Sequence, residues 1–289
     1  MTGAVLVALG LVAGDILVRA LRLRVLLGAV APRAVGSAVV VNAYGDAASA
    51  VTPARLGGEP ARFFALRERK TPAAAALVVL ATERVVDMGL AAVVTVIAIS
   101  FLGARGFGEV AAFLDRFTSP DVLPWMAGIA VLLVAFAGIA VWYRRRIPPT
   151  ARESLRDALA HARTIAGPRF VAAIGLSGLS MGARVAILPV LLWGVGALTD
   201  PLAAAVGSFA LIYAQLLLPT PAGAGGVELA FVVGLAPHLA TTQVATLLVM
   251  WRVLTLVIPA GLGATVFLWR GRLFGGEKRE KREKREKLE

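Results

Sequence analysis

The chain has 289 residues, of which 58% are hydrophobic and only 17% are charged, and its mean hydropathy is +0.79. A soluble domain of this length carries many more polar residues, so the composition predicts a polytopic membrane protein with a net charge of +12. The lack of cysteine and the presence of only 2 histidines exclude thiolate, haem, iron–sulfur and histidine-based zinc sites, so no cofactor and no metal are expected.

Five apolar segments are long enough to cross a bilayer, because about twenty apolar residues in a helix span its hydrocarbon core. The apolar runs are long and continuous, unlike the short alternating strands of membrane barrels, so the predicted fold class is all-α. Helix starts are marked by Thr71-Pro72 and Asp200-Pro201, where a capping side chain precedes proline. The predicted spans are 3–19, 72–103, 122–143, 168–196 and 239–269.

Two further apolar stretches, 34–51 and 201–218, run into proline and glycine clusters instead of polar loops. Basic loops favour the cytoplasm, which places the basic segment 144–169 and the basic C-terminal tail on that side. The segments 19–33 and 55–70 are also basic, although the first apolar stretch lies between them. All basic loops face the cytoplasm only if that stretch dips in and returns, so we expect a re-entrant hairpin in the cytoplasmic membrane.

Three segments are expected outside the spans. The acidic loop 104–121 is predicted to face the outside. The segment 150–166 has one apolar and one basic face, which predicts an amphipathic helix on the anionic inner leaflet. The last residues, 275–289, are predicted to be a solvated low-complexity tail whose final Leu288-Glu289 resembles a cloning remnant.

The proline and glycine clusters form an internal repeat. The motif that runs from Thr52 to Glu59 returns from Thr220 to Glu228, with threonine, proline, alanine and both glycines offset by 168 positions. The same offset carries Arg84-Val85 onto Arg252-Val253, each pair deep in a predicted span. One residue intervenes before the second glutamate, but chance is a poor explanation for seven matches in one register.

Three predicted crossings separate the two copies, so the second copy enters the membrane from the opposite face. The sequence therefore predicts an inverted repeat of span, hairpin and span, the arrangement of transporters whose site lies near mid-membrane. Repeat 1 would cover 1–103 and repeat 2 would cover 168–269, with 122–143 as the linking helix of one membrane domain, 1–274.

The repeated motifs would form the tips of the hairpins. Proline removes a backbone donor and glycine permits close approach, so broken backbone there can present N–H groups and helix ends to a ligand in a wet cavity. The alternative is that both clusters are ordinary interfacial loops. The candidate substrate-binding residues of the tips are Thr52, Pro53, Gly57, Gly58, Thr220, Pro221, Gly225 and Gly226.

Besides Asp15 in the first span, five charged residues lie deep inside predicted spans, where each costs at least about 2.5–3.5 kcal/mol unless a partner, water or a function compensates it. Arg84, Arg184, Arg252 and, next to the first tip, Arg62 are candidate phosphate-binding groups, because the planar guanidinium fork suits phosphate. Four acids lie in the predicted spans or near the tips. One hypothesis is that they act in gating or proton coupling, and the other is that they belong to a structural ion-pair network. These acids are Glu59, Glu83, Asp87 and Glu228.

Local spacing suggests partners for some of these charges. Glu59 and Arg62 are three residues apart, so they form either a surface pair that closes the hairpin or a gate at its mouth. Arg84 stands within ion-pair reach of Asp87 on the same helix. Asp15, in the first span, is expected to pair with Arg19, four residues further on.

In its tip motifs and span charges, the chain resembles the lysylphosphatidylglycerol synthase transmembrane-region family, also called the flippase-like family. The resemblance covers nearly the whole chain except the tail, and Ala222 departs from it by replacing one glycine of the second tip. It implies lipid translocation, and a stand-alone member without the aminoacyl-transferase domain, so synthase activity is not implied. The resemblance is carried by Asn42, Pro53, Gly57-Gly58-Glu59, Arg62, Glu83-Arg84, Asp87, Arg184, the run from Leu218 to Glu228, and Arg252.

The favoured hypothesis is a non-enzymatic flippase for an anionic, phosphate-containing lipid, either a phospholipid or a polyprenyl phosphate. Arg84 and Arg252 would hold the phosphate and Arg184 would be a third contact. No nucleic-acid partner is expected, and the lack of a Walker A motif argues against ATP hydrolysis. Two alternatives remain open at this point: an integral-membrane enzyme that acts on a lipid phosphate, and a non-transporting scaffold.

Overall fold

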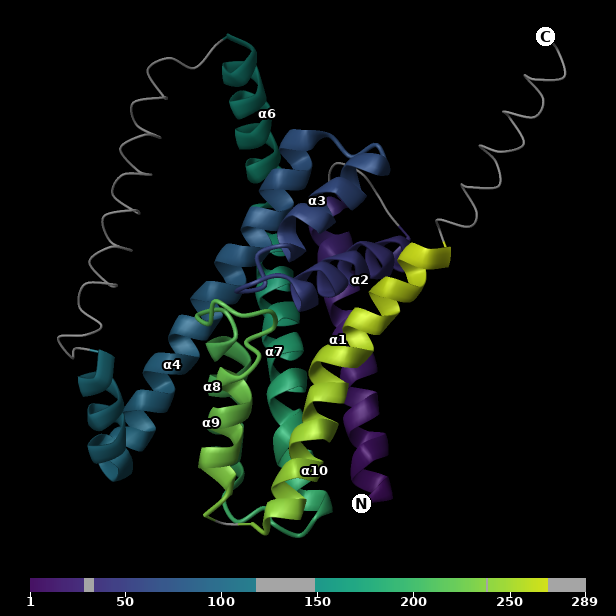
Figure 1. Cartoon of the computed structure of the whole chain (residues 1–289). Helices are drawn as coiled ribbons and strands as arrows, with labels where there is room; N and C mark the ends of the chain where they lie inside the picture. Colours follow the sequence, from purple (N-terminus) through teal and green to yellow (C-terminus); the bar gives the residue numbers. More distant parts are fainter. Residues whose placement is uncertain (29–33, 118–148, 238, 270–289) are drawn as a thin grey trace, which may run out of the picture. The chain divides into compact units, whose positions relative to one another are not determined.

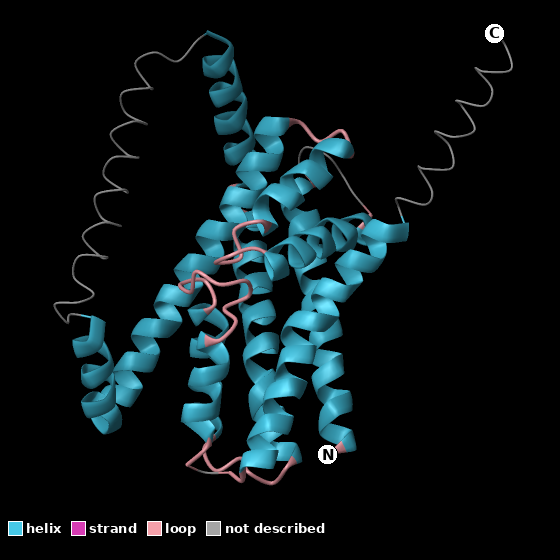
Figure 2. Cartoon of the chain, viewed as in Figure 1, coloured by secondary structure: helices cyan, strands magenta, loops and turns pink. Residues whose placement is uncertain are grey.

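The computed structural model describes residues 1–28, 34–117, 149–237 and 239–269 (Figure 1). The predicted linking helix 122–143 and the tail 275–289 lie outside the described residues. Regular structure in the described ranges is helical, apart from one isolated β-bridge (Figure 2). The all-α class is therefore confirmed. The chain divides into two compact units, Met1–Asp87 with the part from His161 onward, and Met88–Ala160.

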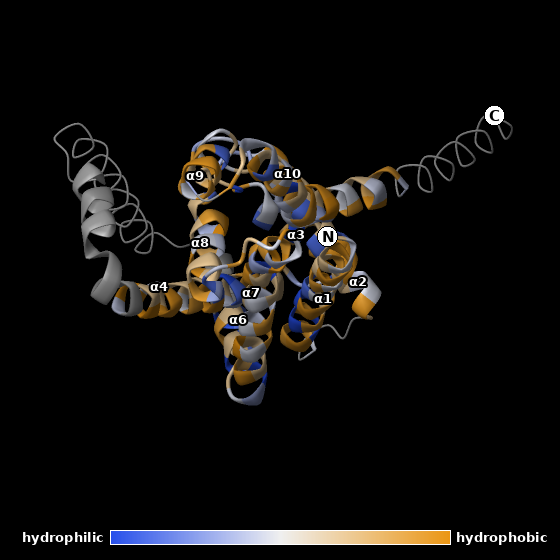
Figure 3. Cartoon of the chain, turned by 90° about the horizontal axis from the view of Figure 1, so that it is seen from below, coloured by the Kyte–Doolittle hydropathy of each residue, from blue (hydrophilic) through white to orange (hydrophobic). Residues whose placement is uncertain are grey.

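Two long apolar helices, α1 (Thr2–Leu27) and α7 (Pro168–Gly194), form the most extensive helix pair of the first unit. They run antiparallel, because Gly194 at the end of α7 lies against Ala4 at the start of α1. At the opposite end, Leu26 of α1 and Ala173 of α7 belong to one buried cluster. Hydrophobic residues dominate both ribbons, and polar positions are interspersed along α1 (Figure 3).

Two pairs of short helices lie beside them. The first pair is α2 (Val35–Val51) and α3 (Gly58–Glu68), joined by the first tip, 52–57. The second pair is α8 (Pro201–Ala214) and α9 (Gly226–Leu235), joined by the second tip, 215–225. At 1.5 Å per residue α8 is about 21 Å long, shorter than a hydrocarbon core of about 30 Å.

The Asp200 side chain and Pro201 explain where the second helix pair begins. The Asp200 side chain accepts hydrogen bonds from the amides of Leu202 (2.9 Å) and Ala203 (3.1 Å), and Pro201 occupies the first helical position. These bonds satisfy donors that the first turn of a helix leaves free. The helix start predicted at Asp200-Pro201 is confirmed.

The remaining helices are α4 (Ala73–Phe117), α6 (Pro149–Ile165) and α10 (Thr241–Arg252). A π-helical turn, η1 (Val253–Val257), follows α10, and helix continues from there to residue 269. Three of the described helices are long and apolar enough to cross a membrane, which supports a multi-pass membrane protein. They are Thr2–Leu27, Pro168–Gly194 and Thr241–Trp269.

Two segments that were predicted to be loops are helical, at least in part. Helix α1 continues through the expected basic loop to Leu27, because Arg19 and Arg22 are neutralised by buried acids described below. Helix α4 continues to Phe117, into the expected acidic loop 104–121. The first part of that loop holds glycines but no proline, and glycine weakens a helix by only about 1 kcal/mol where proline breaks it.

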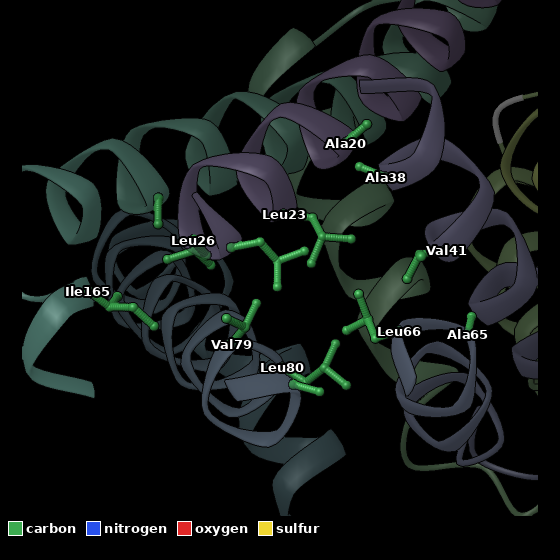
Figure 4. Packing of buried hydrophobic residues seen from close by; sticks show 13 residues of the cluster. Ala20, Leu23, Leu26, Ala38, Val41, Ala65, Leu66, Val79, Leu80 and Ile165 are labelled. Carbon is green, nitrogen blue, oxygen red and sulfur yellow. The ribbon is translucent and has the colours of Figure 1, made fainter. Parts of the chain in front are cut away.

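Two buried apolar clusters hold the first unit together. One joins α1, α2, α3 and α4 with the end of α6 and the start of α7, and Leu23, Leu66 and Val79 are among its fully covered members (Figure 4). The other joins α1, α7, α9, α10 and η1, and it contains the rings of Phe231 and Trp251, which lie 5.7 Å apart. On α1, Asp15 and Arg19 lie between the buried residues of the second cluster, which end at Val12, and those of the first, which start at Ala20.

Candidate functional site

A chain of ion pairs begins in the middle of α1. Arg19 donates to both carboxylate oxygens of Asp46 on α2, each at 2.9 Å, and its Nε lies 3.0 Å from Asp15. The other oxygen of Asp15 accepts from Arg184 of α7 at 3.0 Å and from Ser180. The predicted pairing of Asp15 with Arg19 is therefore present. Three helices share these four charges, which compensates the cost of burying each one.

A second chain of ion pairs begins one turn further along α1. Arg22 donates to Glu83 of α4 at 3.0 Å, to Asp87 at 2.5 Å and to Ser177 of α7 at 2.6 Å. Glu83, only 2% exposed, also accepts from Arg62 of α3. Glu83 and Asp87 thus pair with α1, and no described bond joins Asp87 to Arg84. This arrangement is the ion-pair network that the sequence analysis kept as its alternative.

Two further ion pairs recur at equivalent places of the sequence repeat. Arg84 of α4 donates to Glu59, the residue that follows the first tip, at 2.6 Å. Arg252 of α10 lies 2.5 Å from Glu228, which follows the second tip, and also donates to the Ala222 carbonyl at 3.1 Å. The arginine side chain is 43% exposed in the first pair and 11% exposed in the second.

The two tips have the same backbone turn. In the first tip the amide of Arg55 donates to the Thr52 carbonyl at 3.2 Å, and in the second the amide of Gly223 donates to the Thr220 carbonyl at 3.1 Å. The next amide donates to the proline carbonyl in both tips. Pro53 and Pro221 form an antiparallel β-bridge, so the two repeated motifs touch.

Both turns require left-handed backbone at two consecutive residues. Ala54 and Arg55 have φ values of 48° and 58°, and Ala222 and Gly223 have 50° and 70°. Glycine adopts this conformation freely, whereas a residue with a side chain pays on the order of 1 kcal/mol or more. A strained arginine thus stands in the first tip where the second tip has a glycine.

A pocket opens where the first tip meets α1, α7, α8 and the helix after α10, with about 560 Å³ of empty space. Its charged lining consists of three guanidinium groups and two carboxylates, and the carboxylates are already bound to two of the arginines. The third, Arg55, has only the neutral side-chain amide of Gln215 as a described partner, at 3.1 Å. The charged residues are Asp15, Arg19, Asp46, Arg55 and Arg184.

A smaller pocket of about 320 Å³ shares lining residues with the first. Arg184 and Ile212 line both pockets. The smaller one adds the hydroxyl-bearing side chains of Ser177, Ser180 and Tyr213, together with Asp87. The two pockets therefore form a cationic site beside a hydroxyl-rich one, with the half-exposed Arg184 between them.

The predicted phosphate-binding arginines separate into two groups. Arg184 lines both pockets, whereas Arg62, Arg84 and Arg252 line neither of the two described pockets. Instead, these three bind the acids that were proposed for gating: Arg62 contacts Glu59 and Glu83, Arg84 contacts Glu59, and Arg252 contacts Glu228.

The predicted tip residues mainly hold the turns. Thr52 Oγ1 donates to the Ala48 carbonyl and accepts from the Gly57 amide at 2.9 Å. Gly58 packs against Ser49, where a Cβ would lie 2.1 Å from the hydroxyl oxygen. In the second tip Thr220 donates to the Ala224 carbonyl, and Gly226 packs against Leu218. The amide of Gly225 donates to Glu228 at 2.7 Å.

Several polar lining residues were not proposed as site residues from the sequence, among them Arg19, Asp46, Arg55 and Gln215. Asp46 and Gln215 are isolated polar residues in otherwise apolar stretches, a pattern that could have indicated them. No group of three or more acids, histidines or cysteines in the described ranges could hold a metal ion.

A protein-family model described as the lysylphosphatidylglycerol synthase TM region matches residues 2–263. The chain belongs to this family. The match includes both tips, both ion-pair chains and every charged residue that lines the pockets, so the site lies within the family's membrane region. None of the curated proteins compared with the chain matches it.

Proposed function

We propose that the protein is a flippase, which moves an anionic, phosphate-containing lipid between the leaflets of the cytoplasmic membrane. The observation that carries this proposal is the pocket beside the first tip, where three arginines stand against two carboxylates. The headgroup would enter this pocket and the acyl or prenyl tails would stay in the bilayer. Its membrane family is linked by name to a phospholipid.

The architecture proposed for this function is an inverted repeat with two re-entrant hairpins. Helices α8 and α9 are too short to cross, and the first and second tips meet through the Pro53–Pro221 bridge. The antiparallel α1 and α7 would be the first spans of the two repeats. Such folds place the substrate site at mid-membrane, between broken helices from opposite sides.

Transport without catalysis is the simpler chemistry for this site. An enzyme with neither cysteine nor a histidine at this depth would need a carboxylate as acid or base. Asp15, Asp46 and Glu83 are each bound by arginine, so their carboxylate oxygens are already occupied. The Glu59–Arg84 and Glu228–Arg252 pairs, each linking a tip to a long helix, are the proposed gates.

Lipid exchange in proteoliposomes tests the function. We expect the protein to accelerate exchange of fluorescent phosphatidylglycerol or of a polyprenyl phosphate, as measured by dithionite quenching of the outer leaflet. Arg184→Gln should slow that exchange at least about tenfold, because the headgroup loses a charge-assisted contact. The control is Arg24→Gln, which removes an exposed charge from α1 outside the pocket. Exchange no faster than in empty liposomes would overturn the proposal.

Single cysteines test the topology, because the natural chain has none. If both hairpins are re-entrant, cysteines at Ala34 and Arg67 react with an impermeant maleimide from the cytoplasmic side. Cysteines at Asp200 and Ala236 then react from the other side, and the C-terminal tail is cytoplasmic. Opposite labelling of Ala34 and Arg67 would replace the first hairpin with a full crossing.

A further inference from the structure

We infer that Arg55, in the first tip, is the residue that binds the phosphate of the transported lipid, a role that the sequence analysis assigned to Arg84 and Arg252. This inference rests on the proposed function. The chemistry that Arg55 recognises is a phosphate ester that carries a negative charge.

The charge balance leaves Arg55 as the cation without an acid. Arg19 is held by Asp15 and Asp46, and Arg184 is held by Asp15. In the described part of the chain, Arg55 has no ion pair, and its side chain hydrogen-bonds to the neutral amide oxygen of Gln215. Asp46 lines the same pocket and attracts Arg55 without pairing with it. A guanidinium with no ion pair is unfavourable at membrane depth, so we expect an anion that enters the pocket to complete the site.

The backbone is strained at the same residue. With φ of 58°, Arg55 occupies a conformation that glycine provides without cost. In this turn its side chain lines the pocket and reaches Gln215 of the second tip. Beside the Pro53–Pro221 bridge, the two tips are therefore joined by the same guanidinium that the bound phosphate would need.

The second tip is closely packed at the position that matches Arg55. A Cβ on Gly223 would lie 3.0 Å from Gln215 Cα and 2.9 Å from Val227 Cγ2, so a side chain there would press on Gln215. Glycine in the second tip thus lets Gln215 stay in reach of the arginine of the first tip, and the pair of tips presents a single cationic group. A guanidinium can then exchange its amide partner for two phosphate oxygens, as its planar fork favours.

The variant Arg55→Gly separates binding from folding. It gives the first tip the residue that the second tip already has, so it relieves the strained turn while it removes the charge. The matched control is Ala54→Gly, which relieves the neighbouring left-handed residue of the same turn and keeps Arg55. Arg55→Lys keeps the charge but loses the fork.

The binding experiment uses purified full-length protein in phosphatidylcholine nanodiscs. Dihexanoylphosphatidylglycerol is titrated below its critical micelle concentration, and binding is measured by the shift of the unfolding temperature. We expect Kd to rise roughly 10- to 100-fold in Arg55→Gly and less in Arg55→Lys, with Ala54→Gly like wild type. Inorganic phosphate and glycerol 3-phosphate are titrated in parallel. Both carry a phosphate without acyl chains, so they distinguish a lipid ligand from a free anion.

The outcomes separate this inference from the proposed function. If Arg55→Gly binds phosphatidylglycerol as tightly as wild type, the inference is wrong, even where lipid exchange is intact. If binding depends on Arg55 but no lipid is exchanged, the phosphate site stands and the transporter proposal fails. Equal weakening by Ala54→Gly would also overturn the inference, because the effect would then come from the backbone of the turn.

Discussion

Pro53 and Pro221 face one another in an antiparallel β-bridge, although they are 168 positions apart in the chain. Each belongs to one copy of the repeated threonine-proline motif. The contact explains why both copies contain proline and glycine. These residues interrupt the helices, and two helix interruptions can approach one another more closely than two regular helical turns.

The bridge predicts a disulfide between the tips. Residues opposite one another in an antiparallel pair have Cα atoms about 4.5–5.5 Å apart, which a disulfide can span. Oxidised Pro53→Cys/Pro221→Cys should therefore give a linked peptide pair in mass spectrometry without reductant. The control pair, Pro53→Cys/Thr241→Cys, should give none, because Thr241 lies at the far end of α10 from Arg252, about 16 Å along the helix.

Glu83 should be the most sensitive acid of the second ion-pair chain. It is 2% exposed and binds two arginines, so Glu83→Gln leaves both without their buried partner and should cost about 3 kcal/mol of unfolding free energy. Asp87 is 32% exposed at its side chain, so Asp87→Asn should cost only about 1 kcal/mol. Denaturant unfolding in detergent measures both, and equal losses would contradict the burial argument.

The two tip-linking ion pairs should differ in strength. Arg252 is far less exposed than Arg84, so water screens the Glu228–Arg252 pair less. A double-mutant cycle with Glu228→Gln and Arg252→Gln should give a coupling energy of about 1 kcal/mol or more. The matching cycle at Glu59 and Arg84 should give about 0.5 kcal/mol or less. A larger coupling in the first tip would be the contrary result.

Gly263 should tolerate no side chain, although its neighbour two positions earlier should. A Cβ on Gly263 would lie 1.9 Å from the Ala43 carbonyl oxygen of α2, so Gly263→Ala should cost about 1–3 kcal/mol. Gly261 has nothing within 4 Å of such an atom, and Gly261→Ala should be neutral or stabilise the helix by up to about 1 kcal/mol. Thermal unfolding of the two variants measures the difference.

The sequence reveals the family and three of the five predicted spans but hides the partners of the charges. Apolar runs mark α7 and α10 correctly because their pattern is local. The arginines at the end of α1 were predicted to lie in a loop, because the acids that bind Arg19 and Arg22 are 27, 61 and 65 positions away in the sequence. Local spacing likewise pairs Arg84 with Asp87, whereas the folded chain pairs it with Glu59, 25 positions earlier.

The site was predicted in part for the same reason. The repeat identifies both tips, and Arg184, which has no acid nearby in the sequence, lines both pockets. The role of the repeated arginines as partners of Glu59 and Glu228 depends on contacts across the fold. The lining by Arg55 and Gln215 depends on how two tips from different halves of the chain face each other, which no local pattern encodes.

The π-helical turn after Arg252 changes the rotational phase of the last helix. One extra residue in a turn rotates everything beyond it by about 100° relative to a regular α-helix. This offset lets three consecutive residues, Leu254, Thr255 and Leu256, border the same pocket as Pro259. Deleting one residue from 253–257 would turn Gly263 away from Ala43 while leaving Arg252 in place, and so uncouple the ends of one helix.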